Sequence, residues 1–256
     1  MKENKYKNNK IKSFNNHLYL IISLVIFINL TFIDITFSKV KLSYLKSLNL
    51  DSEITMRLIG SGEQRVLSIH YAGENPDEIY VNNIYNNESS RIVYNLNKSE
   101  NIIKMVWYSP VTNCNGMFAD LSNIIEINLS NFDASLVTDM NLMFYDCHSL
   151  TSVNFNNINS SKVETAFRMF YDCRSLISLD LSQFDSSSLI EMSSMFKDCI
   201  SLKNLNINYF NTTLITDMAS MFYECYSLTS INFNNIDTSK VTNMNSMFYK
   251  CSSLTE

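Results

Sequence analysis

One pattern recurs along the second half of the chain at a fixed interval of 26 residues. Its most regular part is the pair Met-Phe, at residues 117–118, 143–144, 169–170, 195–196, 221–222 and 247–248. Five complete units run from Met117 to Ser246, and a sixth begins at Met247. A period of this length is typical of repeat proteins, in which each unit cannot bury its apolar face alone and neighbouring units share a core.

Each unit contains two apolar spacings. Apolar residues two apart, such as Leu179 and Leu181, predict a short strand with both side chains facing inward. An Asp or Asn then precedes a hydroxyl residue by two positions, as in Asp185 and Ser187, and we expect the hydroxyl to cap a helix. Apolar residues at i, i+3, i+6, i+7 and i+10, as in 241–251, predict a helix of about ten residues. The sequence therefore predicts an α/β, leucine-rich-repeat-like solenoid with one short strand and one short helix per repeat.

The apolar side of the expected helix supplies the expected structural core. Its members are Met143, Phe144, Cys147, Met169, Phe170, Cys173, Met195, Phe196, Cys199, Met221, Phe222 and Cys225. Met and Cys at helical spacing beside Phe pack as apolar side chains. The alternatives are a soft-metal site in the Met column, and disulfides between stacked cysteines about 5 Å apart. We expect buried thiols, because the five repeat cysteines cannot all pair within one column.

The whole unit, MFxxCxSLxxLxLSxFxxSxVTxM, resembles the repeat of the BspA-like leucine-rich-repeat surface proteins, which carry a mycoplasma-lipoprotein-type repeat of unknown function. The resemblance covers residues 117–256 and departs from the pattern at Ala166, which replaces Met, and at Leu121, which replaces the first Cys. It implies an exported, surface-associated protein of a bacterium or microbial eukaryote that adheres to host proteins or to other cells.

The start of the chain predicts export. A lysine-rich stretch, residues 1–12, precedes an apolar run from Leu18 to Ile33, and small residues follow at Thr36 and Ser38. A run this short is typical of a secretory signal, although an uncleaved signal-anchor is the alternative. We therefore expect residues 1–38 to be a signal peptide or signal-anchor, and contact with a membrane only through this segment if it is uncleaved.

Residues 39–116 lack the repeat and predict a small β-rich domain. Segments 54–59 and 66–71 flank a glycine-containing turn and predict a hairpin, with further strands at 79–81, 91–96 and 102–108. Because the first repeat would expose its core, we expect this domain to be the N-terminal cap of the stack. An independent ligand-binding module is the alternative.

Charge and residue chemistry exclude several functions. Residues 117–256 carry 15 Asp and Glu against 7 Lys and Arg, so this region does not attract a phosphate backbone and nucleic acid is not an expected partner. The histidines are His17, His70 and His148, and no phosphate loop, nucleophile elbow or Cys or His pair at the two-to-four-residue spacing of a metal site occurs. We expect no catalysis, no cofactor and no metal site.

The outward side of the expected strands is the candidate binding face. Its polar residues are Asn128, Ser152, Asn154, Asn156, Ser178, Asp180, Ser182, Asn204, Asn206, Asn208, Ser230, Asn232 and Asn234. The face suits hydrogen bonding to a protein or glycan, but a solvated sheet stabilised by side-chain ladders is the equal alternative. The face lacks the aromatic anchors typical of tight interfaces, which Tyr145, Tyr171, Tyr223 and Tyr249 on the other side would supply instead.

These features together predict a secreted or cell-surface protein that binds an extracellular protein or glycan. The last unit ends without a polar cap, so an array-forming component that associates through its uncapped C-terminal repeat is the alternative, and a fragment of a longer product would explain the same feature. An enzyme housed in residues 39–116 and dependent on His70 is the third hypothesis.

Overall fold

The structure is a computed structural model that describes residues 52–86, 93–232 and 236–255. The expected signal segment at residues 1–38, the first part of the β-rich segment and Asn234 of the candidate binding face lie outside these residues. Within them, no helix is long and apolar enough to cross a membrane.

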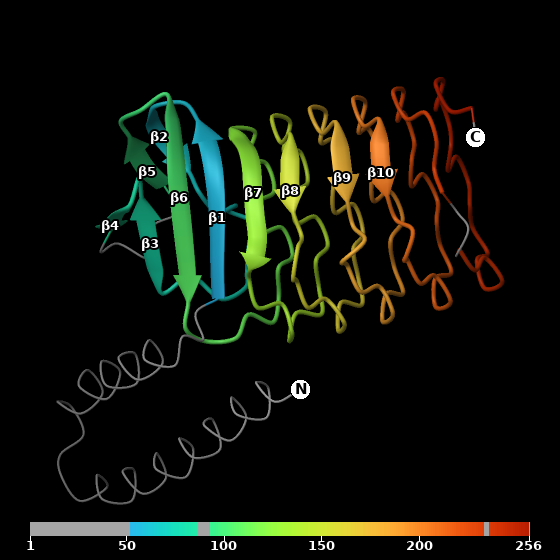
Figure 1. Ribbon diagram of the computed structural model, residues 1–256, viewed down its shortest axis with the longest axis horizontal. Coiled ribbons are helices and arrows are strands. Elements are labelled where there is room, and N and C mark those ends of the chain that lie inside the picture. The colour runs from blue at the N-terminus through green and yellow to red at the C-terminus, as the bar shows by residue number, and fades with distance from the viewer. Residues whose placement is uncertain (1–51, 87–92, 233–235, 256) are drawn as a thin grey trace, which may run out of the picture. The chain divides into compact units, whose positions relative to one another are not determined.

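The β-rich segment and the first repeats share one sheet (Figure 1). Its strand order is β4-β3-β6-β1-β7-β8, formed by β1 (Ser52–Ile59), β3 (Glu78–Val81), β4 (Ile84–Asn86), β6 (Glu100–Trp107), β7 (Ile124–Asn131) and β8 (Ser152–Asn154). β1 pairs antiparallel with β6 on one side and with β7 of the first repeat on the other, whereas β7 and β8 are parallel. Because β1 lies between β6 and β7, the sheet of the β-rich segment continues directly into the repeats.

Two short two-stranded sheets complete the strands. β2 (Gly62–Arg65) pairs antiparallel with β5 (Val93–Leu96), and β9 (Ser178–Asp180) pairs in parallel with β10 (Asn204–Asn206). The expected strands near 79–81, 91–96 and 102–108 are present as β3, β5 and β6. The expected hairpin of 54–59 with 66–71 is wrong, because both edges of β1 are occupied by β6 and β7 and residues 66–71 form no strand.

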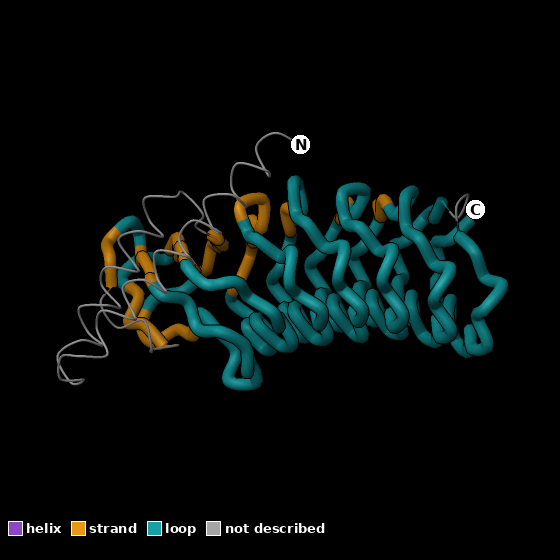
Figure 2. The backbone as a smooth tube through the Cα atoms, turned by 90° about the horizontal axis from the view of Figure 1, so that it is seen from below, coloured by secondary structure: helices purple, strands orange, loops and turns teal. Residues whose placement is uncertain are grey.

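The predicted α/β, leucine-rich-repeat-like solenoid is wrong as a fold class. The described residues contain strands, bends and turns but no helix, as Figure 2 shows along the repeats. An α-helix needs each N–H to donate to the carbonyl four residues earlier, with right-handed φ throughout. The expected helix at residues 137–147 instead contains Leu142 at φ 56° and Asp146 at φ 57°, both in the left-handed region.

Backbone hydrogen bonding explains why these segments are not helical. Alternate N–H groups donate to the next repeat, as from Phe144 to the carbonyl of Met169 at 2.9 Å and from Asp146 to that of Tyr171 at 2.9 Å. The N–H groups between them close tight turns, as from Cys147 to the carbonyl of Phe144 at 3.2 Å. Consecutive tight turns bring side chains to the same side every three or four residues, so their apolar spacing imitates that of a helix.

The expected helix caps are corners closed by Asp and Asn side chains. The carboxylate of Asp185 accepts the backbone N–H of Ser187 at 2.9 Å, and the amide oxygen of Asn211 accepts that of Thr213 at 3.0 Å. In these turns the Asp or Asn, not the hydroxyl residue, satisfies the backbone. Such corners let the repeats turn sharply although the chain has only four glycines.

One apolar core runs from the β-rich segment through the repeats. Its central feature is a stack of phenylalanine rings with one ring from each repeat, in which neighbouring centroids lie 5.1–5.8 Å apart between Phe118 and Phe248. Trp107 of β6 packs edge-on against Phe132 of the first repeat, at 5.9 Å between centroids. Aromatic pairs in these geometries add stabilisation beyond the apolar area they bury.

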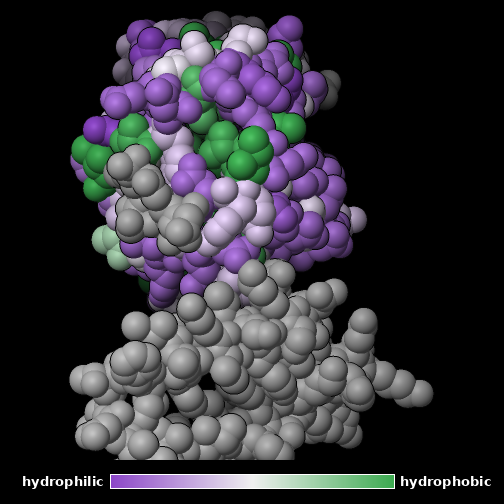
Figure 3. Space-filling model, turned by 90° about the vertical axis from the view of Figure 1, so that its left-hand side faces the viewer, coloured by the Kyte–Doolittle hydropathy of each residue, from purple (hydrophilic) through white to green (hydrophobic). Residues whose placement is uncertain are grey.

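The two ends of the row of repeats differ in what covers them. The β-rich end presents a mostly hydrophilic surface with scattered apolar patches (Figure 3). Near residue 247, by contrast, Phe248 is 40% exposed and Met244 is 44% exposed, whereas their counterparts Phe222 and Met218 are buried.

Candidate functional site

The twelve-position core expected from the sequence is buried without exception. Met143, Phe144, Cys147, Met169, Phe170, Cys173, Met195, Phe196, Cys199, Met221, Phe222 and Cys225 are each at most 1% exposed. Each repeat cysteine is a free thiol, and each donates to a phenylalanine carbonyl, as from Cys173 Sγ to Phe144 O at 3.2 Å. Burial raises the pKa of Cys173 well above its usual value, which leaves this thiol unreactive at neutral pH.

The strand face carries the remaining site residues, and is defined as the outward side of β7, β8, β9 and β10, the residues two positions after β8, β9 and β10 (Asn156, Ser182 and Asn208) and residues 230–232. Asn128, Asn156, Ser152, Ser178, Asp180, Asn204, Ser230 and Asn232 are exposed, and Asn154, Ser182, Asn206 and Asn208 are half-buried. Asn154 donates through Nδ2 to Asn128 Oδ1 at 3.0 Å, and Asn206 does the same to Asp180 Oδ1 at 2.9 Å. These side chains therefore form part of the ladder that holds neighbouring repeats together, and the face also offers polar atoms to solvent.

Two shallow grooves cross the strand face. The first, of about 370 Å³, is lined by residues of β1, β7 and β8 that include Arg57, Glu126 and Asn154. Arg57 pairs with Glu126 and, at 3.1 Å, with Glu100, while its buried Nε has no hydrogen-bond partner among the described residues. The second groove, of about 390 Å³, is lined by residues of β9 and β10 together with Asn208, Ser230 and Asn232.

Four tyrosines of the repeats lie in a row, each directly after a Met-Phe pair. Tyr145 stacks on Tyr171 at 4.9 Å between centroids, and Tyr223 stacks on Tyr249 at 4.8 Å. Lys197 stands between the two pairs, with Nζ 5.7 Å from the Tyr171 centroid and 4.3 Å from that of Tyr223. Lys197 therefore joins the two tyrosine pairs into one row through cation–π contacts. The positions of the aromatic residues in the sequence do not by themselves predict this link.

A row of acidic residues follows the tyrosines, one position further along each repeat. The acid row consists of Asp120, Asp146, Asp172, Asp198 and Glu224, all in the left-handed region. Side-chain nitrogens from other positions reach several of them, as at 3.3 Å from His70 Nε2 to Asp120 Oδ2 and 2.7 Å from Lys250 Nζ to Glu224 Oε1. The row concentrates negative charge along one edge of the molecule.

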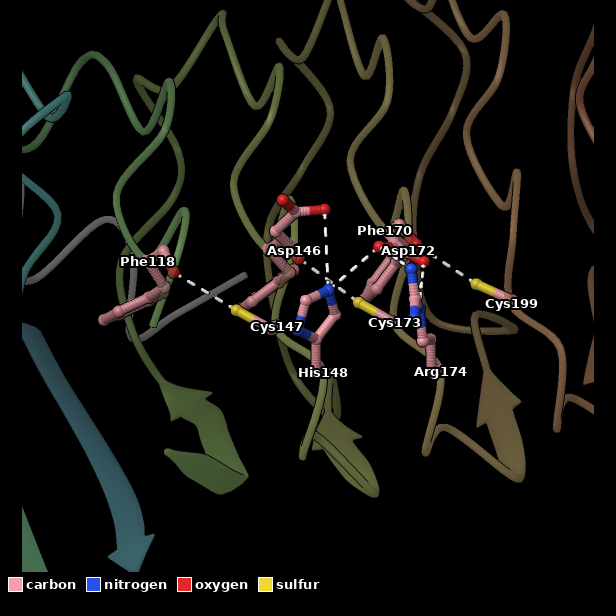
Figure 4. Close-up of polar contacts among 10 residues, drawn as sticks. Phe118, Asp146, Cys147, His148, Phe170, Asp172, Cys173, Arg174 and Cys199 are labelled. Atoms are coloured by element: carbon pink, nitrogen blue, oxygen red, sulfur yellow. Dashed lines mark hydrogen bonds and ion pairs between the residues drawn. The ribbon is translucent and has the colours of Figure 1, made fainter. Parts of the chain in front are cut away.

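A group of ionisable side chains is centred on Asp172, as Figure 4 shows. His148 Nε2 lies 2.9 Å from Asp172 Oδ2 and 3.8 Å from Asp146 Oδ1. Arg174 donates to both oxygens of Asp172, from Nε at 2.7 Å and from NH2 at 2.9 Å. The sequence analysis missed this group because its members belong to two repeats and only stacking brings them together.

The pKa values of the two carboxylates in this group are shifted in opposite directions. Burial, followed by the nearby charge of Asp172, raises the pKa of Asp146. Burial alone would also raise the pKa of Asp172, but hydrogen bonds from Arg174 and His148 outweigh it and hold that pKa below its usual value. Asp172 is therefore the carboxylate whose ionised form the fold stabilises.

Replacing Asp172 with asparagine is expected to lower the free energy of unfolding by about 1 kcal/mol at neutral pH, the scale of a partly exposed ion pair. The lowered folded-state pKa means that this stabilisation is present above about pH 4, near the pKa of an unfolded Asp. It is lost as the pH falls through the folded-state pKa. Urea unfolding of both proteins at a series of pH values measures the difference.

Asp198 provides the matched control from the next repeat. Burial raises the pKa of Asp198, so folding disfavours its ionised form and Asp198→Asn should not reduce stability at neutral pH. Equal, pH-independent losses in the two variants would contradict the assignment of Asp172 as the stabilising carboxylate.

The family described as Mycoplasma protein of unknown function, DUF285, matches residues 87–203 and residues 176–256, overlapping stretches that together cover more than half of the chain. No curated protein and no solved structure matches. The chain therefore belongs to this family of Mycoplasma-type proteins of unknown function.

Proposed function

We propose that this chain is an exported surface protein whose strand face binds an extracellular protein or glycan, without catalysis. The observation that carries the proposal is the strand face itself, where exposed polar side chains occupy the same positions in successive repeats and two shallow grooves cross them. A regular array of hydrogen-bonding groups suits an extended ligand with its own repeating polar groups.

The family resemblance supports the same role. The repeat motif resembles that of the BspA-like surface proteins, whose adhesive behaviour makes binding to host proteins or to other cells the function we propose for this chain. The strand face lacks exposed tryptophan, and its amides also hold the repeats together, so we expect its affinity to arise from many weak contacts.

Introducing arginine at Ser178 and Asn204 is expected to weaken ligand binding at least about tenfold, equivalent to about 1.4 kcal/mol. Both side chains line the second groove and are exposed, so a bulky cation would block the groove without disturbing the core. The full-length chain would be screened against arrays of glycans and extracellular matrix proteins, and the double variant tested on every ligand found.

Ile190→Arg with Thr216→Arg is the matched control, because both residues are exposed and lie outside the strands. We expect this control to retain binding. Equal loss of binding in both double variants would contradict the assignment of the strand face as the binding surface. A screen that finds no ligand would contradict an adhesive function.

A second candidate is a structural, array-forming role, in which chains associate through the exposed apolar side chains of Met244 and Phe248. Sedimentation of the same samples over a range of concentrations separates the two functions. Concentration-dependent assembly that Phe248→Glu abolishes would favour the array, whereas a monomer that binds ligand would favour adhesion.

A further inference from the structure

We propose that Asp146, His148 and Asp172 form a binding site for a divalent metal ion of the Zn²⁺ type, held between the second and third repeats. One ligand atom from each residue lies within 4.8 Å of the other two. Two of the residues come from one repeat and the third from the next, so the site exists only where the repeats stack (Figure 4).

The separations of the two carboxylate oxygens from His148 Nε2 suit a small ion, and the two carboxylate oxygens lie within 4.8 Å of each other. Zn²⁺ binds imidazole nitrogen and carboxylate oxygen at about 2.0–2.2 Å, which places tetrahedral ligand atoms roughly 3.3–3.5 Å apart. His148 Nε2 is 2.9 Å from Asp172 Oδ2 and 3.8 Å from Asp146 Oδ1. Movements of a few tenths of an ångström in side chains that are partly exposed would therefore bring these separations close to those of a bound ion.

The donor set identifies the class of metal. An imidazole nitrogen with two carboxylate oxygens suits Zn²⁺ and related transition metals, whereas Ca²⁺ and Mg²⁺ prefer six or more oxygen ligands. The ion would bind His148 Nε2 in the tautomer that carries its proton on Nδ1. Three protein ligands leave a fourth position for water.

The residues that follow the acid row explain why, among the described residues, such a group forms between the second and third repeats. Two positions after each acid, the repeats carry Ser122, His148, Arg174, Ile200 and Tyr226. Of these five side chains, His148 is the one with an imidazole nitrogen that can bind a metal. Asp146 lies 3.8 Å from His148 Nε2, beyond hydrogen-bond distance, so a bound ion would neutralise a carboxylate that its neighbours otherwise repel.

The positive charge of Arg174 disfavours binding of a metal ion at this site. Its guanidinium donates to both oxygens of Asp172 and brings a positive charge close to the ion. Removing this charge should therefore strengthen metal binding, although it would weaken a purely structural salt-bridge network. This opposite sign distinguishes a metal site from an ion-pair cluster.

Titration of the metal-free, full-length chain with Zn²⁺ in a calorimeter tests the proposal. We expect binding near one ion per chain, weakened at least about tenfold by His148→Gln and by Asp146→Asn, because each substitution alters one of the three protein ligands. Arg174→Gln should bind several-fold more tightly. Asp198→Asn, which changes the acid row one repeat away, should leave the affinity unchanged, and Ca²⁺ should not compete.

The cysteines require a separate readout, since thiolates bind Zn²⁺. Cobalt(II) in place of zinc should give a spectrum of nitrogen and oxygen ligation without thiolate charge-transfer bands, because the repeat thiols of the folded chain are buried, except for the partly exposed Cys251. Circular dichroism and urea unfolding would verify that each variant folds. Zinc affinity unaffected by His148→Gln and Asp146→Asn, reduced by Arg174→Gln, or accompanied by thiolate bands would overturn the proposal.

Discussion

Phe170→Ala is expected to lower the free energy of unfolding by about 3–5 kcal/mol, the range for large-to-small changes of a buried aromatic residue. The Phe170 ring is fully buried and stacks between Phe144 at 5.1 Å and Phe196 at 5.7 Å, with Phe155 edge-on at 6.2 Å. Removing it leaves a cavity in the middle of the stack, where the neighbouring repeats cannot close the gap without breaking their backbone hydrogen bonds. Urea unfolding followed by circular dichroism measures the loss.

Ile177→Ala is the control in the same repeat. Ile177 is 51% exposed, so its truncation should change stability by less than about 0.5 kcal/mol. Hydrogen exchange adds a spatial readout, since the inter-repeat bonds next to Phe170 should lose protection first. Comparable stability of the two variants would contradict the packed stack of rings.

Trp107→Ala is expected to cost about 3–5 kcal/mol as well, and to destabilise the repeats together with the β-rich segment. Trp107 is 1% exposed, packs edge-on against Phe132, and donates through Nε1 to the carbonyl of Glu74 at 2.7 Å. Because β1 also pairs with β7 of the first repeat, the loss should spread across a shared sheet and a shared core.

Trp107→Phe separates packing from hydrogen bonding. It keeps an aromatic ring against Phe132 and removes only the indole donor and part of the volume, so its cost should be smaller than that of Trp107→Ala. In the wild-type chain Trp107 is the single tryptophan, so its fluorescence reports on this junction. Fluorescence and circular dichroism should give the same unfolding midpoint, and two separate transitions would contradict a shared core.

The candidate site shows the limits of reading one repeat at a time. The strand-face residues could be picked out because they alternate with buried residues such as Leu179 and Leu205 along each strand. The group of Asp146, His148 and Asp172 could not, because the distance between His148 and Asp172 depends on how successive repeats are stacked. A comparison of residues one period apart pairs Asp146 with Asp172 and His148 with Arg174, and would therefore have brought the side chains of this group together.

The sequence alone determined the register of the repeats and the residues that fill their interior. Side chains at equal intervals must share an environment when units pack alike, and burial of the Met, Phe and Cys columns follows from their polarity. The tertiary structure decided the backbone conformation. A helix keeps its N–H groups within the segment, whereas here the partner of Phe144 N–H is Met169 O in the next repeat. Both arrangements bury the same side chains at the same spacing, so only the contact between repeats selects the helix-free one.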